Sequence, residues 1–195
     1  MIEQRWRERG LRALVAFALA AVSPIVAGNE ALWTLLRAGG QVVLMRHAET
    51  TPGVGDPAGM RLDECATQRN LNDEGRRQSE QVGRAFRERG VAVARVLSSP
   101  WCRCLETARI AFGPPTTEQA LSNLFGRSDP SGAQVTALAA IVGERRGTAN
   151  WVLVSHGSTI QALTGVSPGF AEFVVVTPQG NGKFTLAGRV PLEAR

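Results

Sequence analysis

The chain has only two histidines, His47 and His156, and each follows a short apolar run of the kind that forms a buried strand. A neutral imidazole is a competent nucleophile near neutral pH because its unperturbed pKa is about 6.5. Arg46 precedes the first histidine, and Arg103 follows a third apolar run. Guanidinium groups bind phosphate through paired hydrogen bonds. These residue types predict transfer of a phosphoryl group to His47, with Arg46, Arg103 and His156 forming the phosphate pocket.

The apolar runs alternate with amphipathic stretches, which predicts strands alternating with helices. Strands are expected at 41–45, 94–97, 151–154, 172–177 and 183–190, the last at a sheet edge, and helices at 29–36, 73–89, 101–112, 131–145 and from 158 onward. Polar segments with Gly and Pro predict loops at 50–70 and 116–130. This order predicts an α/β fold, a three-layer sandwich with a mostly parallel central sheet and helices on both faces.

In such sheets, ligands bind in loops beyond the carboxyl ends of the strands. The residues that follow three of the predicted strands are Arg46-His47, Ser98 to Arg103, and Ser155-His156. Both histidines and both arginines therefore belong to one edge of the sheet.

Four segments, in order, resemble motifs of the histidine phosphatase superfamily, which has the phosphoglycerate mutase-like fold. They are Leu44 to Thr50, similar to the Arg-His-Gly motif; Leu71 to Gly75; Ser98 to Arg103 with Glu106-Thr107-Ala108; and Val154 to Gly157. The resemblance covers roughly residues 40 to 165. It implies that His47 becomes phosphorylated, that Arg46, Arg103 and His156 hold the phosphoryl group, and that neither a metal nor another cofactor is needed.

The sequence also departs from the family pattern. Ala48 stands where the family has Gly, which requires a turn without positive φ at that position. The glutamate that serves as proton donor in mutase-like members is missing, and no Asp follows His156. The candidate donors are the carboxyl groups nearest in sequence, Glu118, Asp129 and Glu49. The missing acid favours a substrate whose leaving group needs little protonation, such as a phosphoanhydride or an anomeric phosphate.

Three further residues are candidates for substrate binding. Arg69, in the loop before the 73–89 helix, is placed to hold a second anionic group at the pocket rim, with a solvated loop arginine as the alternative. Thr50 and Ser158 are candidate hydroxyl donors, with turn or capping roles as the alternative.

Composition indicates one globular domain, with 44% hydrophobic and 20% charged residues in 195. The formal charge is +5. The first 27 residues hold four arginines and two glutamates, so the remainder carries +3. Without a dense basic stripe carrying aromatic residues, this surplus does not indicate nucleic-acid binding.

Residues 1–27 have the parts of a secretory signal peptide: basic residues from Arg5 to Arg12, an apolar run from Ala13, and small residues at Ala27 and Gly28. The alternative is an uncleaved anchor, although the uncharged run 13–27 is shorter than the roughly 20 residues of a spanning helix. We therefore expect an exported protein whose folded domain spans residues 28–195. Membrane contact is expected only if the segment stays uncleaved.

The three cysteines of the chain, Cys65, Cys102 and Cys104, can form a disulfide or stay unpaired. In an oxidising compartment Cys65 can pair with Cys102 or with Cys104. Equally, all three can be buried, unpaired side chains.

The function expected from these features is an extracytoplasmic phosphatase acting on a small or glycan-linked phosphate, such as a lipopolysaccharide-core phosphate. One alternative is a phosphohistidine-protein phosphatase. Another is a non-catalytic phosphate-binding module of the same fold.

Overall fold

The computed structural model describes residues 24–126 and 132–192. The helices are α1 (Pro24–Ala38), α2 (Asp73–Glu88), α3 (Cys102–Phe112), α4 (Gly132–Gly143) and α5 (Gly157–Thr164), with short 3-10 helices η1 (Cys65–Thr67) and η2 (Gln119–Leu121). The strands are β1 (Val42–Arg46), β2 (Arg95–Ser98), β3 (Thr116–Thr117), β4 (Trp151–Ser155), β5 (Phe173–Gly180) and β6 (Lys183–Val190).

The strands form one six-stranded sheet in the order β3-β2-β4-β1-β5-β6. The four strands β3, β2, β4 and β1 are parallel neighbours, whereas β5 pairs antiparallel with β1, and β6 pairs antiparallel with β5. The chain therefore forms the predicted α/β fold with a mostly parallel sheet and β6 at its edge, although β5 and β6 make the sheet mixed. The parallel part brings the carboxyl ends of β2, β4 and β1 to one side of the molecule.

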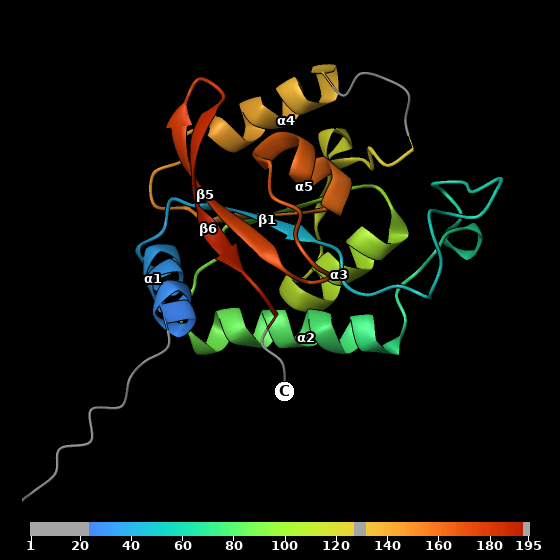
Figure 1. Cartoon of the computed structure of the whole chain (residues 1–195), viewed down its shortest axis with the longest axis horizontal. Helices are drawn as coiled ribbons and strands as arrows, with labels where there is room; N and C mark the ends of the chain where they lie inside the picture. Colours follow the sequence, from blue (N-terminus) through green and yellow to red (C-terminus); the bar gives the residue numbers. More distant parts are fainter. Residues whose placement is uncertain (1–23, 127–131, 193–195) are drawn as a thin grey trace, which may run out of the picture.

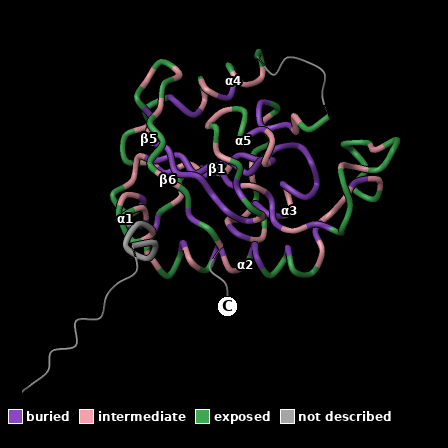
Figure 2. Tube along the Cα trace, in the orientation of Figure 1, coloured by how far each residue is buried: buried purple, intermediate pink, exposed green. Residues whose placement is uncertain are grey.

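Helices cover both faces of the sheet, with α1, α2 and α3 on one side and α4 and α5 on the other (Figure 1). Side chains of β1 alternate between two apolar cores: Val43 and Met45 pack with α1, α2 and α3, while Val42 and Leu44 pack with α4 and α5. The central strands β1 and β4 are buried on both faces, and the trace at the centre of the molecule is accordingly purple (Figure 2). This explains why β1 and β4 are continuously apolar in sequence.

Helix α2 starts as the sequence predicts. The Asn72 side chain accepts a hydrogen bond from the Gly75 amide at 2.7 Å and caps the helix, and acidic residues occupy the first turn. A Cβ at Gly75 would lie 2.0 Å from the Glu49 carbonyl oxygen. Glycine at this position therefore lets α2 approach the segment that follows β1.

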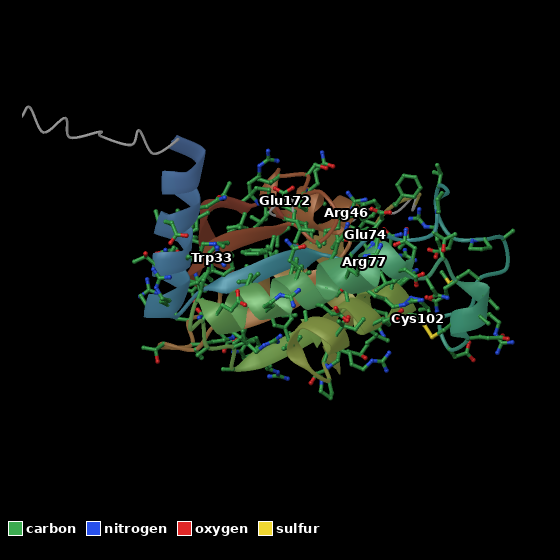
Figure 3. The ribbon with its side chains drawn as sticks, turned by 90° about the horizontal axis from the view of Figure 1, so that it is seen from below. Trp33, Arg46, Glu74, Arg77, Cys102 and Glu172 are labelled. Carbon is green, nitrogen blue, oxygen red and sulfur yellow. A yellow bond between two sulfur atoms is a disulfide. The ribbon has the colours of Figure 1, made fainter. Side chains whose placement is uncertain are left out.

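The connection between β1 and α2 projects from the body of the molecule and is mostly exposed (Figures 1 and 2). A disulfide between Cys65 and Cys102 joins it to the start of α3, as the yellow bond at Cys102 shows (Figure 3). Cys104 is a free, buried thiol. Of the two sequence alternatives, the structure has the paired one, with Cys102 as the partner.

The structure differs from the sequence prediction mainly at element ends. Helix α1 runs from Pro24 rather than from residue 29, and Gly39, at φ 84°, ends it as expected. The segment 116–130, predicted as a loop, contains β3 and η2. These elements are too short to carry a periodic sequence pattern.

The predicted signal peptide lies largely outside the described residues, which begin at Pro24, so it stays a prediction. Within the described ranges, no helix combines the length and the apolar character that crossing a bilayer requires.

Candidate active site

The two histidines meet beyond the carboxyl ends of neighbouring strands β1 and β4. Their ring centroids lie 5.4 Å apart. The backbone fixes this arrangement, because the His47 amide donates to the Ser155 carbonyl at 2.9 Å. Both side chains are almost fully buried, with 3% and 2% of their surface exposed.

His47 is held in the tautomer that a nucleophile needs. Its Nδ1 lies 2.8 Å from the Ala48 carbonyl oxygen, so Nδ1 carries the proton and Nε2 keeps its lone pair. The turn that presents this carbonyl has no positive φ at Ala48. The Ala48 amide donates to Thr107 Oγ1 at 3.1 Å, which ties the turn to α3.

The ring of His47 is also neutral. Burial and then the positive charge of Arg103 lower its pKa to about 3, outweighing the hydrogen bond to Ala48. A neutral imidazole with a free Nε2 is ready to attack an electrophilic phosphorus atom.

His156 is fixed from both sides of its ring. Its Nε2 lies 2.8 Å from Ser99 Oγ, and its Nδ1 lies 3.5 Å from Arg103 Nη2. Burial lowers the pKa of His156 well below its usual value, and His47 and Arg103 add to the effect. Without an anion nearby, this imidazole is neutral at neutral pH.

Three arginines surround the histidines. Arg46, Arg69 and Arg103 line the same cavity as both rings, and the cavity volume is about 360 Å³. In each of them the Nε atom is buried and has no hydrogen-bond partner among the described residues. Among residues 24–126 and 132–192, no carboxyl group lines this cavity. Three guanidinium groups with unused donors and two neutral imidazoles make a site complementary to an anion such as a phosphoryl group.

Arg46 is held against the loop that precedes β5. Its Nη1 donates to the Pro168 carbonyl at 3.0 Å, and its guanidinium carbon lies 4.0 Å from the centroid of the Phe170 ring. Glu172 lies close to it (Figure 3) and supports its charge. Burial and the neighbouring Arg69 lower the pKa of Arg46.

Of the remaining sequence candidates, two line the cavity. Arg69 contributes its guanidinium, and Ser158 lies at the start of α5 with its Oγ 2.9 Å from Asn123 Oδ1. Thr50 does not line it; this side chain is buried, and its backbone forms a bridge with Leu71.

Glu49 and Glu118, the candidate proton donors that lie in the described part of the chain, do not point toward the cavity. Glu49 accepts hydrogen bonds from Asn72 and Gln78, at 2.8 and 3.4 Å, and therefore points toward α2. Glu118 caps η2 by accepting from the Ala120 amide at 3.0 Å. Asp129 lies outside the described residues. Neither Glu49 nor Glu118 reaches the cavity, so the structure assigns the donor role to neither.

Sequence reasoning missed Asp56 and Phe170. Asp56, in the projecting connection, accepts from Arg103 Nη1 and Nη2 at 2.6 and 3.1 Å. Both residues lie in loops. Loops have no regular spacing of hydrophobic residues from which the buried side chains could be predicted. Asp56 lies between Gly55 and Pro57, and a sequence of this kind indicates only a turn.

Within the described part of the chain, no group of three or more His, Cys, Asp or Glu side chains is arranged to hold a metal ion.

The fold is phosphoglycerate mutase-like, and the ends of its parallel strands carry a histidine-centred anion pocket. The family model of the histidine phosphatase superfamily (branch 1) matches residues 42–125, which include β1, the connection with Arg69, and Arg103. Over this stretch the chain is similar to the histidine phosphatase superfamily.

Solved structures share the fold at low sequence identity. The protein histidine phosphatase SixA complexed with tungstate is 21% identical, with a TM-score of 0.54 over 77% of this chain and 96% of that one. A putative alpha-ribazole-5'-P phosphatase from Escherichia coli is 15% identical, with a TM-score of 0.63 over 80% and 100%. A mycobacterial glucosyl-3-phosphoglycerate phosphatase is 18% identical, with a TM-score of 0.52 over 76% and 97%. A comparison with curated proteins gave no match.

The buried neutral histidines predict loss of stability in acid. In the unfolded chain an imidazole binds a proton below about pH 6.5, whereas His47 in the folded protein stays neutral down to about pH 3. The unfolded state therefore binds more protons between these values. Each such histidine lowers the free energy of unfolding by up to about 1.4 kcal/mol for every pH unit of acidification across this window.

Urea unfolding at about pH 7, 5.5 and 4.5 measures this effect. His47→Gln removes one of the two titrating groups and is expected to weaken the pH dependence. An equally steep dependence in the variant would show that His47 is not kept neutral by folding.

Proposed function

We propose that the protein is a phosphatase that acts outside the cytoplasm and hydrolyses a phosphomonoester through a phosphohistidine on His47. The observation that carries this proposal is the anion pocket, in which three arginines with unpartnered Nε atoms surround two neutral histidines.

The chemistry runs in two steps. His47 Nε2 attacks phosphorus, a P–N bond forms, and the P–O bond to the leaving group breaks. Water then attacks the phosphohistidine, releases orthophosphate and restores the imidazole. The cations of Arg46, Arg103 and Arg69 stabilise the charge on the non-bridging oxygens as it develops.

The cavity favours a leaving group that is stable as an anion. None of the described side chains that line it is a carboxyl group, so none of them is an acid placed to protonate an alkoxide. This agrees with a phosphoanhydride or an anomeric sugar phosphate more readily than with an ordinary alkyl phosphate.

The side chains that line the cavity also indicate which chemical group carries the phosphate of the substrate. Val54 and Phe125, 89% and 58% exposed, line the cavity together with Phe170. Apolar side chains around a polar floor suit a phosphate attached to a group with an apolar face, such as a sugar ring. A glycan-linked phosphate, for example in a lipopolysaccharide core, is therefore our proposed substrate class.

Two features support a location outside the cytoplasm. The first is the signal-like composition of residues 1–27. The second is the Cys65–Cys102 disulfide, since such bonds persist mainly in oxidising compartments. Mass spectrometry of the protein from its native host tests this: an N-terminus near Gly28 in the periplasmic or secreted fraction is expected, and a cytoplasmic protein retaining Met1 would contradict it.

A phosphohistidine-protein phosphatase is the second candidate, favoured by the structural likeness to SixA over nearly all of that chain. Both candidates predict hydrolysis of para-nitrophenyl phosphate by the purified full chain, undiminished by EDTA. A panel of sugar phosphates, nucleoside diphosphates and a phosphohistidine peptide then separates them by kcat/KM. Orthophosphate binding without turnover of any of these compounds would identify a non-catalytic binding module instead.

A further inference from the structure

Asp56 lies beside the candidate active site, and its hydrogen bonds with the described residues come from Arg69, Trp101 and Arg103. It accepts from both terminal nitrogens of Arg103, from Trp101 Nε1 at 3.1 Å and from the Arg69 amide at 3.2 Å. The Asp56 side chain is 10% exposed and that of Arg103 only 1%. Burial opposes ionisation of Asp56, but its hydrogen bonds with Arg103 outweigh it and hold its pKa below the usual value.

The donors of Arg103 divide between two edges of its guanidinium. The Nη1–Nη2 edge faces Asp56, and Nη1 also lies 3.4 Å from the Arg69 carbonyl. The Nε–Nη2 edge is different: Nε has no partner among the described residues, and Nη2 lies 3.5 Å from His156 Nδ1. A planar guanidinium can bind two anions at once, one at each edge. The edge beside the histidines is the one that Asp56 does not use.

Asp56 also orients a neighbour of His156. The indole of Trp101, which donates to Asp56 Oδ2, packs edge-on against the His156 ring with centroids 5.2 Å apart. One carboxylate therefore fixes two side chains that contact the second histidine.

The connection that carries Asp56 is itself fastened to α3. Gln68 Oε1 accepts from the Cys102 amide at 2.9 Å, and the Cys65–Cys102 disulfide lies beside it. Because Arg103 follows Cys102 directly, the connection and the arginine are held to the same helix turn.

We propose that Asp56 is a positioning residue, which holds one edge of the Arg103 guanidinium so that the other edge faces the phosphoryl group beside His47 and His156. This inference rests on the proposed function, because it assigns Arg103 to the phosphoryl group. In this arrangement Asp56 contacts no substrate and exchanges no proton.

The competing interpretation is that Asp56 occupies the place of the substrate phosphate on Arg103. The two interpretations predict opposite signs. A positioning carboxylate strengthens binding of a phosphate ion, whereas a competing carboxylate weakens it. Inorganic phosphate titrated against the purified full chain, followed by calorimetry, therefore separates them without requiring turnover.

The test compares Asp56→Asn with Asp63→Asn. Asp63 lies in the same connection and also pairs with an arginine, Arg61, but its side chain is 72% exposed and does not line the cavity. We expect Asp56→Asn to weaken phosphate binding several-fold and to lower kcat for para-nitrophenyl phosphate by about 10- to 100-fold, since small displacements of a binding group cost rates of this order. Asp63→Asn is expected to match the unchanged chain in both measurements.

Both variants are assayed at a temperature below the midpoint of their thermal unfolding. The folded fraction is measured by near-ultraviolet circular dichroism. Phosphate binding that is tighter or unchanged in Asp56→Asn would overturn the inference, as would a kcat loss that only follows the folded fraction. If the unchanged chain binds phosphate but turns over no ester, the proposed function fails while the binding comparison still tests Asp56. If it binds no phosphate at all, both fail.

Discussion

Replacing His47 with Ala is expected to lower phosphate-ester hydrolysis by roughly four orders of magnitude or more, the usual cost of removing a nucleophile. Of the two neutral histidines on this cavity, His47 keeps a free lone pair on Nε2 because its Nδ1 donates to Ala48, whereas both ring nitrogens of His156 are in hydrogen-bond contact, with Ser99 and Arg103. Steady-state assays with para-nitrophenyl phosphate measure the loss.

The same variant tests the covalent intermediate. Reactions with phosphorus-labelled substrate, quenched with detergent at alkaline pH because the P–N bond of phosphohistidine hydrolyses in acid, are expected to give a labelled peptide that contains residue 47, and none in His47→Ala. His156→Ala is the informative control because it removes the other imidazole and keeps the attacking one. It is expected to turn over slowly while still carrying label on the peptide with His47. Label on the peptide with residue 156 in the unchanged chain would reverse the assignment of the nucleophile.

Loss of turnover in His47→Ala has to be distinguished from loss of fold. The imidazole is buried and neutral, so its removal leaves no unpaired buried charge at neutral pH. The variant is therefore expected to stay folded at neutral pH and to bind inorganic phosphate through Arg46, Arg69 and Arg103. An inactive variant that no longer binds phosphate would not establish His47 as the nucleophile.

Much of the fold follows from local sequence patterns. The run 41–45 is apolar at every position but its first, which indicates a strand covered on both faces, and β1 packs into both cores. The 73–89 segment has a cap, an acidic first turn and an apolar stripe, and α2 spans 73–88. These patterns work because they report burial over several consecutive residues.

The position of the site was also predictable, because it depends on the ends of the strands. Arg46 and His47 follow β1 in sequence, so the sheet alone carries them to the same edge as His156. Arg103 is the second residue of α3, so its place on the first helical turn after β2 also puts its side chain near the strand ends, and the family motif indicated the same position.

Contacts made by loop residues could not be predicted from the sequence patterns. Asp56 reaches Arg103 across 47 residues, and Cys65 reaches Cys102 across 37. Nothing periodic marks either partner, since each contact is fixed locally, the first by a pair of hydrogen bonds and the second by a disulfide. Pairing of Cys65 with Cys104 was equally open because Cys102 and Cys104 differ only in which side of α3 they occupy, and Cys104 faces the sheet.

Replacing Arg103 with Lys tests directly whether the guanidinium group must present two separate hydrogen-bonding edges. An ammonium group keeps the charge but is a single point donor, so it cannot face Asp56 and a phosphoryl group with two separate edges. We expect kcat/KM for para-nitrophenyl phosphate to fall by about 100- to 1,000-fold, equivalent to about 3 to 4 kcal/mol of transition-state stabilisation. Arg109→Lys, an exposed position on the same helix, is expected to leave kcat/KM unchanged.

Combining the two substitutions shows whether Asp56 acts through Arg103. If it does, Asp56→Asn costs little further activity once residue 103 is lysine, because the edge that it orients is already gone. Additive losses in the double variant would mean that Asp56 acts independently of Arg103. Full activity of Arg103→Lys would mean that charge alone suffices at this position, and that the second guanidinium edge plays no part in holding the phosphoryl group.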